Sequence, residues 1–186
     1  CLFQDMYGND WYMGTTGVSV RHIFERRIVL HPVFFDKDSL MYAYTGFGDY
    51  PMSMPTKKIN SPEELATGWM LLSYRKLVRV SSEQRKHPAC CAVDESIRSW
   101  WSAETGDTGE FLSLDLGEVC EVRAIQINFA DEDAQLSGGV SDTYQYHLET
   151  STDGKKWKPV GEKSLRITDT QHDYVVLEKP LASRYL

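Results

Sequence analysis

The sequence lacks any apolar run long enough to cross a membrane as a helix. Such a helix needs about 20 consecutive apolar residues, and the stretch RIVLHPVFF at 27–35 is interrupted by His31 and Pro32. Basic residues are also few, because 20 Lys and Arg stand against 27 Asp and Glu, for a net charge of −7. Nucleic-acid binding depends on clustered positive charge. We therefore expect neither a membrane nor a nucleic acid among the partners.

Cysteines are scarce, and their spacing is not that of metal ligands. The four are Cys1, Cys90, Cys91 and Cys120, with no CxxC pair and no zinc-type cluster with histidine. A chain of 186 residues can bury a core without disulfides. We expect buried or half-buried thiols, and we keep open a disulfide between Cys120 and one of the adjacent pair.

Helical signals are limited to SPEELAT at 61–67, where Pro62 follows a serine in N-cap position and predicts one or two turns. Elsewhere, runs rich in β-branched and aromatic residues alternate with turn residues. In EVRAIQINFA at 121–130, apolar and polar residues alternate, as a half-covered sheet requires. The chain is predicted to be all-β.

A basic, polar stretch at 74–88 separates two sets of predicted strands, so we expect two parts, 1–78 and 79–186. The first is short for an independent all-β domain. The chain also begins at Cys1 with neither an initiator Met nor a signal peptide. We expect a piece of a longer protein, whose first part completes a larger domain.

Five motifs follow one another in the second part: Ser81-Ser82, AVDESIRSWWSAE, GEFLSLDLGEVCEVRAIQI, YHLETSTDGKKWKPVG and ASRYL. With these motifs, residues 79–186 resemble the coagulation factor 5/8 type C (F5/8 type C), or discoidin-like, domain. That family overlaps the family 32 carbohydrate-binding modules and is galactose-binding-like. The resemblance implies a jelly-roll β-sandwich, truncated at its C-terminus because family members continue with another core strand.

In the resembled family, the loop A-x-D-G-x-x-x-T-x-W often holds a structural Ca²⁺, an ion that prefers carboxylate and carbonyl oxygens. Ala92 and Asp94 match this motif, whereas Ser99 stands for Thr and Glu95 for Gly. A left-handed turn is harder to form at Glu95 than at glycine. The resemblance implies Asp94 as the Ca²⁺ ligand.

Two adjacent tryptophans, Trp100 and Trp101, end this motif. Strand alternation turns one toward the core and the other outward. An exposed indole can stack on the apolar face of a sugar, which makes Trp101 the candidate carbohydrate platform. Packing in the core or at its edge is the alternative, and the other aromatic residues Tyr144, Tyr146 and Trp157 are no better candidates.

The motifs in the first part are FQDMYGNDWYMG at 3–14, similar to a D-x-x-G-N-x-W hairpin, and ERRIVLHPVFFDKDS at 25–39, similar to G-R-E-T-x-L-x-P-V-x-W-x-x-D-G. With them, residues 1–78 resemble the end of a family 43 glycoside hydrolase, a five-bladed β-propeller of the xylosidase and arabinosidase type. The motif's arginine binds substrate in that family, which implies Arg26 as a substrate-binding residue. Glu25 and Arg27 depart from the motif.

The resembled family 43 consists of inverting glycosidases, which hold two carboxyl groups about 6.5–9.5 Å apart. In the resembled family these carboxyls come from earlier blades, whose motifs are absent here. Asp36 and Asp38 lie in a turn, where Asp is favoured for local hydrogen bonds. We therefore predict no catalytic residue in this chain, although its parent would be a glycoside hydrolase.

The resemblances together predict the C-terminal part of a secreted, periplasmic or cell-surface hydrolase of plant-type polysaccharide, with an accessory module that binds carbohydrate or buttresses the enzyme. The implied partners are glycans containing xylose, arabinose or galactose, and the remainder of the propeller. A stand-alone adhesion module that binds glycans or protein is the alternative.

Overall fold

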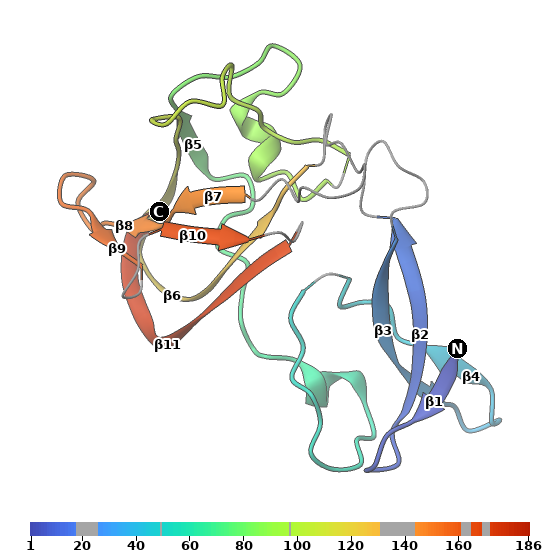
Figure 1. The fold of residues 1–186 in the computed structure, drawn as a ribbon. Coiled ribbons are helices and arrows are strands. Elements are labelled where there is room, and N and C mark those ends of the chain that lie inside the picture. Colours follow the sequence, from blue (N-terminus) through green and yellow to red (C-terminus); the bar gives the residue numbers. More distant parts are fainter. Residues whose placement is uncertain (18–25, 49, 97, 131–143, 161–164, 169–171) are drawn as a thin grey trace. The chain divides into compact units, whose positions relative to one another are not determined.

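Antiparallel β-strands form nearly all of the regular structure in this computed structural model, which describes residues 1–17, 26–48, 50–96, 98–130, 144–160, 165–168 and 172–186 (Figure 1). The prediction of an all-β chain is confirmed. Within these residues no helix is long and apolar enough to cross a membrane. The chain divides into two compact units, Cys1–Met70 and Leu71–Leu186.

The first unit is built on one four-stranded antiparallel sheet, in which each strand pairs with the next along the chain. Its strands are β1 (Leu2–Gln4), β2 (Asp10–Gly17), β3 (Arg26–Phe35) and β4 (Met41–Ala43). A single 3-10 turn, η1 (Pro62–Leu65), occupies the segment for which a short helix was predicted. The propeller expected for this part is not seen among the described residues, which form one sheet.

One face of this sheet is covered by a small core. Trp11 and Phe34 are 1% and 9% exposed, and Ile59 and Leu65, from the segment after the sheet, are 5% and 0% exposed. Buried Asn9 ties that segment to the sheet, because its side-chain oxygen accepts the Ile59 N–H at 2.8 Å. The segment that follows β4 therefore closes one side of the sheet.

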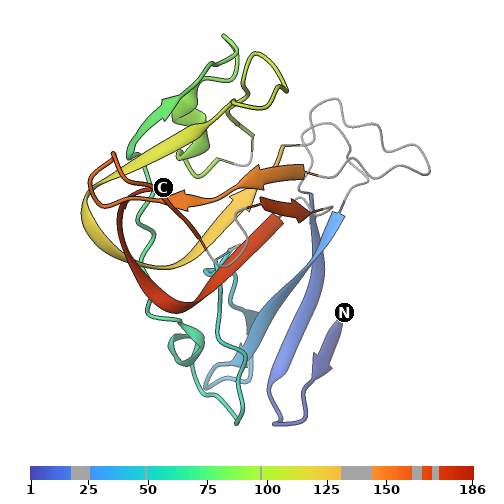
Figure 2. The same ribbon diagram turned by 60° about the vertical axis from the view of Figure 1, so that its left-hand side comes forward.

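The second unit is organised around one long strand, β6 (Leu112–Asn128), which pairs with β5 (Leu77–Val80) and β11 (His172–Tyr185). Figure 2 shows β6 and β11 as two long curved strands that run side by side. Two smaller antiparallel pairs complete the sheets: β7 (Tyr144–His147) with β10 (Leu165–Thr168), and β8 (Glu149–Thr150) with β9 (Lys158–Pro159). The division between the two compact units falls between Met70 and Leu71, and Leu72 packs on the core of the second unit.

The core of the second unit follows the predicted alternation along β6. Leu114 and Leu116 are 8% and 1% exposed and pack with Val93 and Val122. In the sequence, Leu112, Leu114 and Leu116 alternate with Ser113 and Asp115, which predicts one strand followed by a tight turn at Gly117. Gly117 instead lies at an irregularity inside one continuous strand, where it adopts φ +92°. Glycine tolerates this backbone conformation, so the strand bends without ending.

The C-terminal residue is paired with the same strand. The Leu186 N–H donates to the Leu114 carbonyl at 3.1 Å, and the Leu114 N–H donates to the Leu186 carbonyl at 2.8 Å. Beside them, the Arg184 guanidinium donates from Nε and Nη2 to the two carboxylate oxygens of Asp115, at 2.8 and 3.0 Å. A two-pronged pair of this kind is geometrically specific and fixes the end of β11 against β6.

Candidate functional site

The two tryptophans of the AVDESIRSWWSAE motif are both held by their surroundings. Trp101 is half-buried, and its indole N–H donates to the Ser82 carbonyl at 3.1 Å. Trp100 stacks on His87, with ring centroids 4.2 Å apart and an interplanar angle of 19°. The rings are therefore fixed in the loop, and a role of Trp101 in stacking on sugar stays a prediction.

A hydrogen-bonded carboxylate organises the same loop region. The hydroxyls of Ser81, Ser82 and Thr105 donate to Glu110, with distances of 2.8 Å from Ser82 and 2.7 Å from Thr105. These bonds, that from Ser81 foremost, lower the pKa of Glu110 to about 2. Ser82 Oγ also accepts the backbone N–H of Glu104 at 3.0 Å. Ser82 thus links both ends of the loop that carries the tryptophans.

The predicted Ca²⁺ ligand, Asp94, is half-buried and bound to its own turn. Its Oδ1 accepts the Ser96 N–H at 2.9 Å and its Oδ2 accepts the Ser99 hydroxyl at 2.6 Å. Glu95 adopts φ +61°, so the left-handed turn forms there without glycine. No three His, Cys, Asp or Glu side chains converge as metal ligands within the described part of the chain. Calcium would need backbone carbonyls for most of its ligands, and its binding stays a prediction.

Arg26 lies at the first position of β3, where its Cα is paired with that of Gly17. Its side chain lies outside the described residues, so its predicted contact with substrate also stays a prediction. All four thiols are free. Cys91 and Cys120 are half-buried, as expected, whereas Cys1 and Cys90 are exposed, so the expectation of burial is wrong for these two. The disulfide to Cys120 that the sequence left open is absent.

Side chains that the sequence did not single out as a set meet where four strands of the second unit begin or end. We call this set the strand-end cluster; its members are Asn128, Phe129, Tyr144, Tyr146, Arg166, His172 and Asp173. Phe129 stacks on Tyr144 with ring centroids 4.1 Å apart and an interplanar angle of 8°, and it lies 5.7 Å from the Tyr146 ring. These rings join the β7–β10 pair to the β6–β11 sheet.

Polar groups surround these rings. The Tyr146 hydroxyl donates to Asp173 Oδ2, and Arg166 Nε donates to the same oxygen at 3.3 Å. Burial, followed by the hydrogen bond to Asp173, raises the pKa of Tyr146 to about 12. Tyr146 therefore remains a protonated donor at neutral pH.

A second polar group lies on the opposite side of the β6–β11 ladder. The Asn128 amide oxygen is hydrogen-bonded to His172 Nδ1 and accepts a bond from Gln126 Nε2 at 3.1 Å. The face with the aromatic rings therefore carries the Arg166 guanidinium and the Asp173 carboxylate, whereas the Asn128 amide and the His172 imidazole lie on the other face. Rings beside polar groups suit a sugar, because its C–H face is apolar and its hydroxyls both donate and accept hydrogen bonds.

The sequence points to Tyr144 and Tyr146 only as separate aromatic residues that could stack on a sugar. The other members come from the end of β6, from Phe129 directly after it, and from β10 and β11. They meet because the ladder pairs His172 with Asn128 and Asp173 with Ile127. One pattern in the sequence does point to this region. Near the end of the alternating strand, Gln126 and Asn128 are polar and face away from the core. Alternation identifies the face, but only the register identifies the neighbours.

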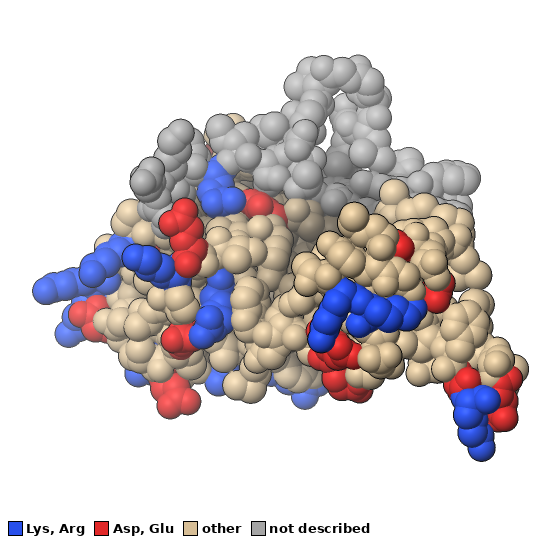
Figure 3. Space-filling view, turned by 90° about the horizontal axis from the view of Figure 1, so that it is seen from below, with Lys and Arg blue, Asp and Glu red and all other residues tan. Residues whose placement is uncertain are grey.

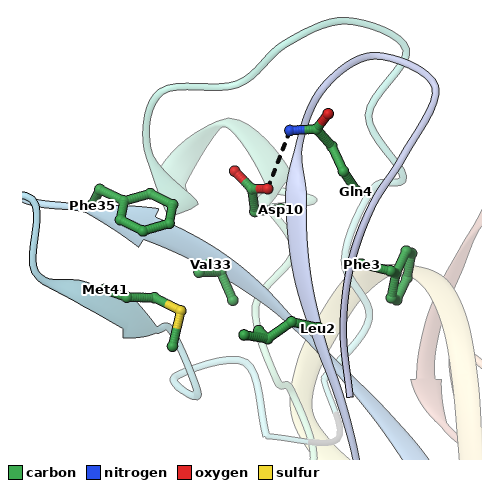
Figure 4. Close-up of a pocket in the computed structure, with 7 residues that line it drawn as sticks. All are labelled: Leu2, Phe3, Gln4, Asp10, Val33, Phe35 and Met41. Carbon is green, nitrogen blue, oxygen red and sulfur yellow. Dashed lines mark hydrogen bonds between the residues drawn. The ribbon is translucent and has the colours of Figure 1, made fainter.

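The first unit carries a separate, mostly apolar hollow. Its volume is about 270 Å³, and it is lined by Leu2, Phe3, Gln4, Asp10, Val33, Phe35 and Met41. In Figure 4 the hydrogen-bonded pair Gln4 and Asp10 lies on one side, whereas Phe35 and Met41 lie on the other. Phe35 and Met41 are 55% and 51% exposed. This face of the sheet therefore presents apolar side chains to solvent.

Charged side chains give no sign of a strongly charged ligand on the face shown in Figure 3. Acidic and basic groups alternate there among uncharged residues. Among the described residues of that face, charges of one sign do not merge into a large patch.

Comparisons with known proteins place the second unit. Residues 78–186 match the family model of the F5/8 type C domain. A chitosan-binding module of a chitosanase/glucanase from Paenibacillus sp. IK-5, solved with chitotriose, is 18% identical over 62% of this chain and 82% of its own, with a TM-score of 0.49. The family 32 module of NanJ from C. perfringens, solved with galactose, is 21% identical over 60% of this chain and 78% of its own, with a TM-score of 0.46.

A chain described as a glycoside hydrolase is 19% identical over 100% of this chain and 41% of its own length, with a TM-score of 0.46. No curated protein matches the chain in sequence. The family match alone extends over more than half of the 186 residues. Through its second unit, the chain belongs to the F5/8 type C domain family.

Proposed function

We propose that the second unit is a carbohydrate-binding module of the galactose-binding-like type, and that the strand-end cluster contributes its binding surface. The observation that carries the proposal is the meeting of stacked rings with donors and acceptors in a unit of the F5/8 type C family. Neutral glycans with xylose, arabinose or galactose are the proposed ligands. Ring stacking would supply most of the affinity, and hydrogen bonds to hydroxyls would supply the selectivity.

Affinity electrophoresis in gels containing arabinoxylan, arabinan or galactan tests this proposal. We expect retardation of the full chain by at least one polymer. Tyr144→Ala should weaken binding about fivefold, because a lost stacking contact is worth about 1 kcal/mol. If the full chain moves as fast in all three gels as in a gel without polymer, carbohydrate binding is overturned and the protein-binding alternative is favoured.

Two matched variants locate the surface. Trp157→Ala removes an aromatic ring outside the strand-end cluster, 38% exposed in the β8–β9 hairpin, and should leave binding unchanged. Trp101→Phe keeps a ring but removes the indole N–H that bonds to Ser82. If Trp101→Phe weakens binding and Tyr144→Ala does not, the platform is the tryptophan loop.

We propose for the first unit that it is the end of a family 43-like hydrolase propeller. Support comes from its four-stranded meander with one covered face and one apolar, exposed face. A sheet of this kind buries its second face against another sheet in layered β folds. The remainder of the propeller is the proposed partner for this face, and Arg26 would bind the xyloside or arabinoside in the intact enzyme. An extracellular, periplasmic or cell-surface location belongs to the same proposal.

The chain itself is proposed to be inactive, because its two predicted parts contain no catalytic carboxyl motif. Incubation with aryl xylosides and aryl arabinofuranosides should release no more phenol than buffer does. Release that depends on protein concentration would contradict this proposal while leaving the binding module untouched. The double variant Asp36→Asn/Asp38→Asn would then show whether these two carboxyl groups contribute to the release of phenol.

A further inference from the structure

Two neighbouring thiols occupy a short turn that the proposed function does not use. Cys90 and Cys91 lie in the 3-10 turn η2 (Ala89–Ala92), where Cys90 is exposed and Cys91 is half-buried. Cys120, the other thiol of this unit, donates from Sγ to the Glu118 carbonyl at 3.6 Å. The adjacent pair is therefore chemically accessible as a dithiol.

We propose that Cys90 and Cys91 form a redox modification site, a dithiol that small disulfides convert reversibly into a disulfide between the two neighbouring residues. The proposal is independent of carbohydrate binding. It requires only that both thiols be free and that the first be open to solvent, as the structure shows.

The chemistry is two successive thiol–disulfide exchanges with a small disulfide such as oxidised glutathione. The exposed Cys90 thiol loses its proton and attacks one sulfur, which forms a mixed disulfide and releases one glutathione thiolate. The Cys91 thiol then loses its proton, attacks Cys90 Sγ and releases the second thiolate. The two cysteines lose two electrons in total, and the glutathione disulfide takes them up.

The resulting bond would be easily reduced. Neighbouring Cα atoms are about 3.8 Å apart, whereas protein disulfides usually join Cα atoms about 4.4–6.8 Å apart. The ring is therefore strained, and strained or exposed disulfides are the labile ones. The geometry points to a reversible modification rather than to a structural crosslink.

Formation of the disulfide would change the structure beyond the turn. The Cys91 N–H donates to the Pro88 carbonyl at 3.0 Å, and the Val93 N–H donates to the Cys90 carbonyl at 3.4 Å. Val93 is 7% exposed and belongs to the core of the second unit. A backbone change at Cys90 and Cys91 therefore disturbs a core residue, and we expect the oxidised chain to melt at a lower temperature.

Intact-mass spectrometry of the full chain tests the proposal. The reduced Cys1→Ser chain, which lacks the other exposed thiol, is incubated with oxidised glutathione at neutral pH, and excess reagent is removed. We expect a loss of 2 Da, no retained glutathione, and a peptide map with the bond between Cys90 and Cys91. Dithiothreitol should restore the original mass. A stable glutathione adduct, a bond to Cys120 or a disulfide-linked dimer would each overturn the proposal.

A second probe measures the dithiol without oxidation. Phenylarsine oxide condenses with two close thiols to form two As–S bonds and one water. We expect one equivalent to bind to the reduced chain and none to Cys90→Ala, whereas Cys120→Ser binds one equivalent like the parent. Circular dichroism of each variant checks that the fold is kept. Equal binding by Cys90→Ala and the parent chain would contradict the assignment.

Discussion

The two units bury their sheets to different extents. In the second unit, the β6–β11 sheet contacts the β7–β10 pair through Phe129 and Tyr146, and its core lies around Leu116. In the first unit, the hydrophobic core lies on the face that carries Trp11, whereas on the opposite face Val33 is 5% exposed and Phe35 is 55% exposed. The comparison teaches that the two faces of one sheet can be covered to different extents. The following predictions test that difference.

Truncation of one central leucine in each core should have the largest effect. Leu116→Ala in the second unit and Leu65→Ala in the first each remove a side chain that is at most 1% exposed. Each should lower the free energy of unfolding by about 2–5 kcal/mol, the cost of a buried leucine and the cavity it leaves. Urea unfolding, followed by circular dichroism, measures the effect. Val176→Ala, at a side chain 56% exposed, is the control.

Two separate transitions in urea, each shifted by only one of the two variants, would show that the units unfold independently. One shared transition shifted by both would show that they unfold together. A shift below 1 kcal/mol for Leu65→Ala would contradict the assigned core of the first unit, because that leucine is fully buried.

Acid should weaken both units over the same pH range. The pKa of Asp5 is lowered from 3.8 to about 2, because hydrogen bonds led by those from Asn9 and Trp11 outweigh the opposing effect of burial. The pKa of Glu110 is lowered from 4.5 to about 2 by its hydroxyl donors. A depressed pKa contributes stability that is complete above the ordinary value and is lost as the pH falls toward 2.

Melting temperatures at pH 6, 4, 3 and 2 measure this loss. Asp5→Asn should flatten the pH dependence of the first unit, and Glu110→Gln that of the second. Glu178→Gln changes an exposed carboxyl for which no hydrogen bond is seen in the described residues, and it should keep the parent profile. If Asp5→Asn and Glu110→Gln lose as much melting temperature in acid as the parent chain does, the hydrogen bonds to these two carboxylates do not stabilise the units.

Calcium, if held by Asp94, should stabilise only the second unit. Ca²⁺ at 100 times its dissociation constant would add about 2.7 kcal/mol to the free energy of unfolding. Melting in EDTA and again with excess CaCl₂ measures this gain. Asp94→Asn keeps an acceptor for the Ser96 N–H but removes the charge, so it should abolish the gain. Identical melting in EDTA and calcium would remove the predicted site.

The smallest effect is expected on the open face of the first unit. Phe34 and Phe35 are neighbours on opposite faces of β3, at 9% and 55% exposed. Phe35→Ser should change the free energy of unfolding by no more than about 0.5 kcal/mol, as exposed sites usually do. Phe34→Ser should cost several times more. A large loss for Phe35→Ser would mean that this face is covered in the isolated chain.

Local patterns predicted much of this structure. Alternation along 112–116 and 121–130 correctly identified the buried face of β6, and Pro62 marked the single turn of η1. The prediction of a turn at Gly117 was wrong. Glycine permits a tight turn as well as a bend within a strand, and here the pairing with β11 keeps the strand continuous. The strand-end cluster was missed as a set because its members are brought together by register, which a single sequence does not state.

The reciprocal pairing of Leu186 with Leu114 has a consequence for variants made at this position. Both backbone groups of Leu186 are engaged, and Arg184 binds Asp115 beside them. Proline at position 186 would have no N–H to donate to the Leu114 carbonyl, so Leu186→Pro should loosen this part of the chain from the middle of β6.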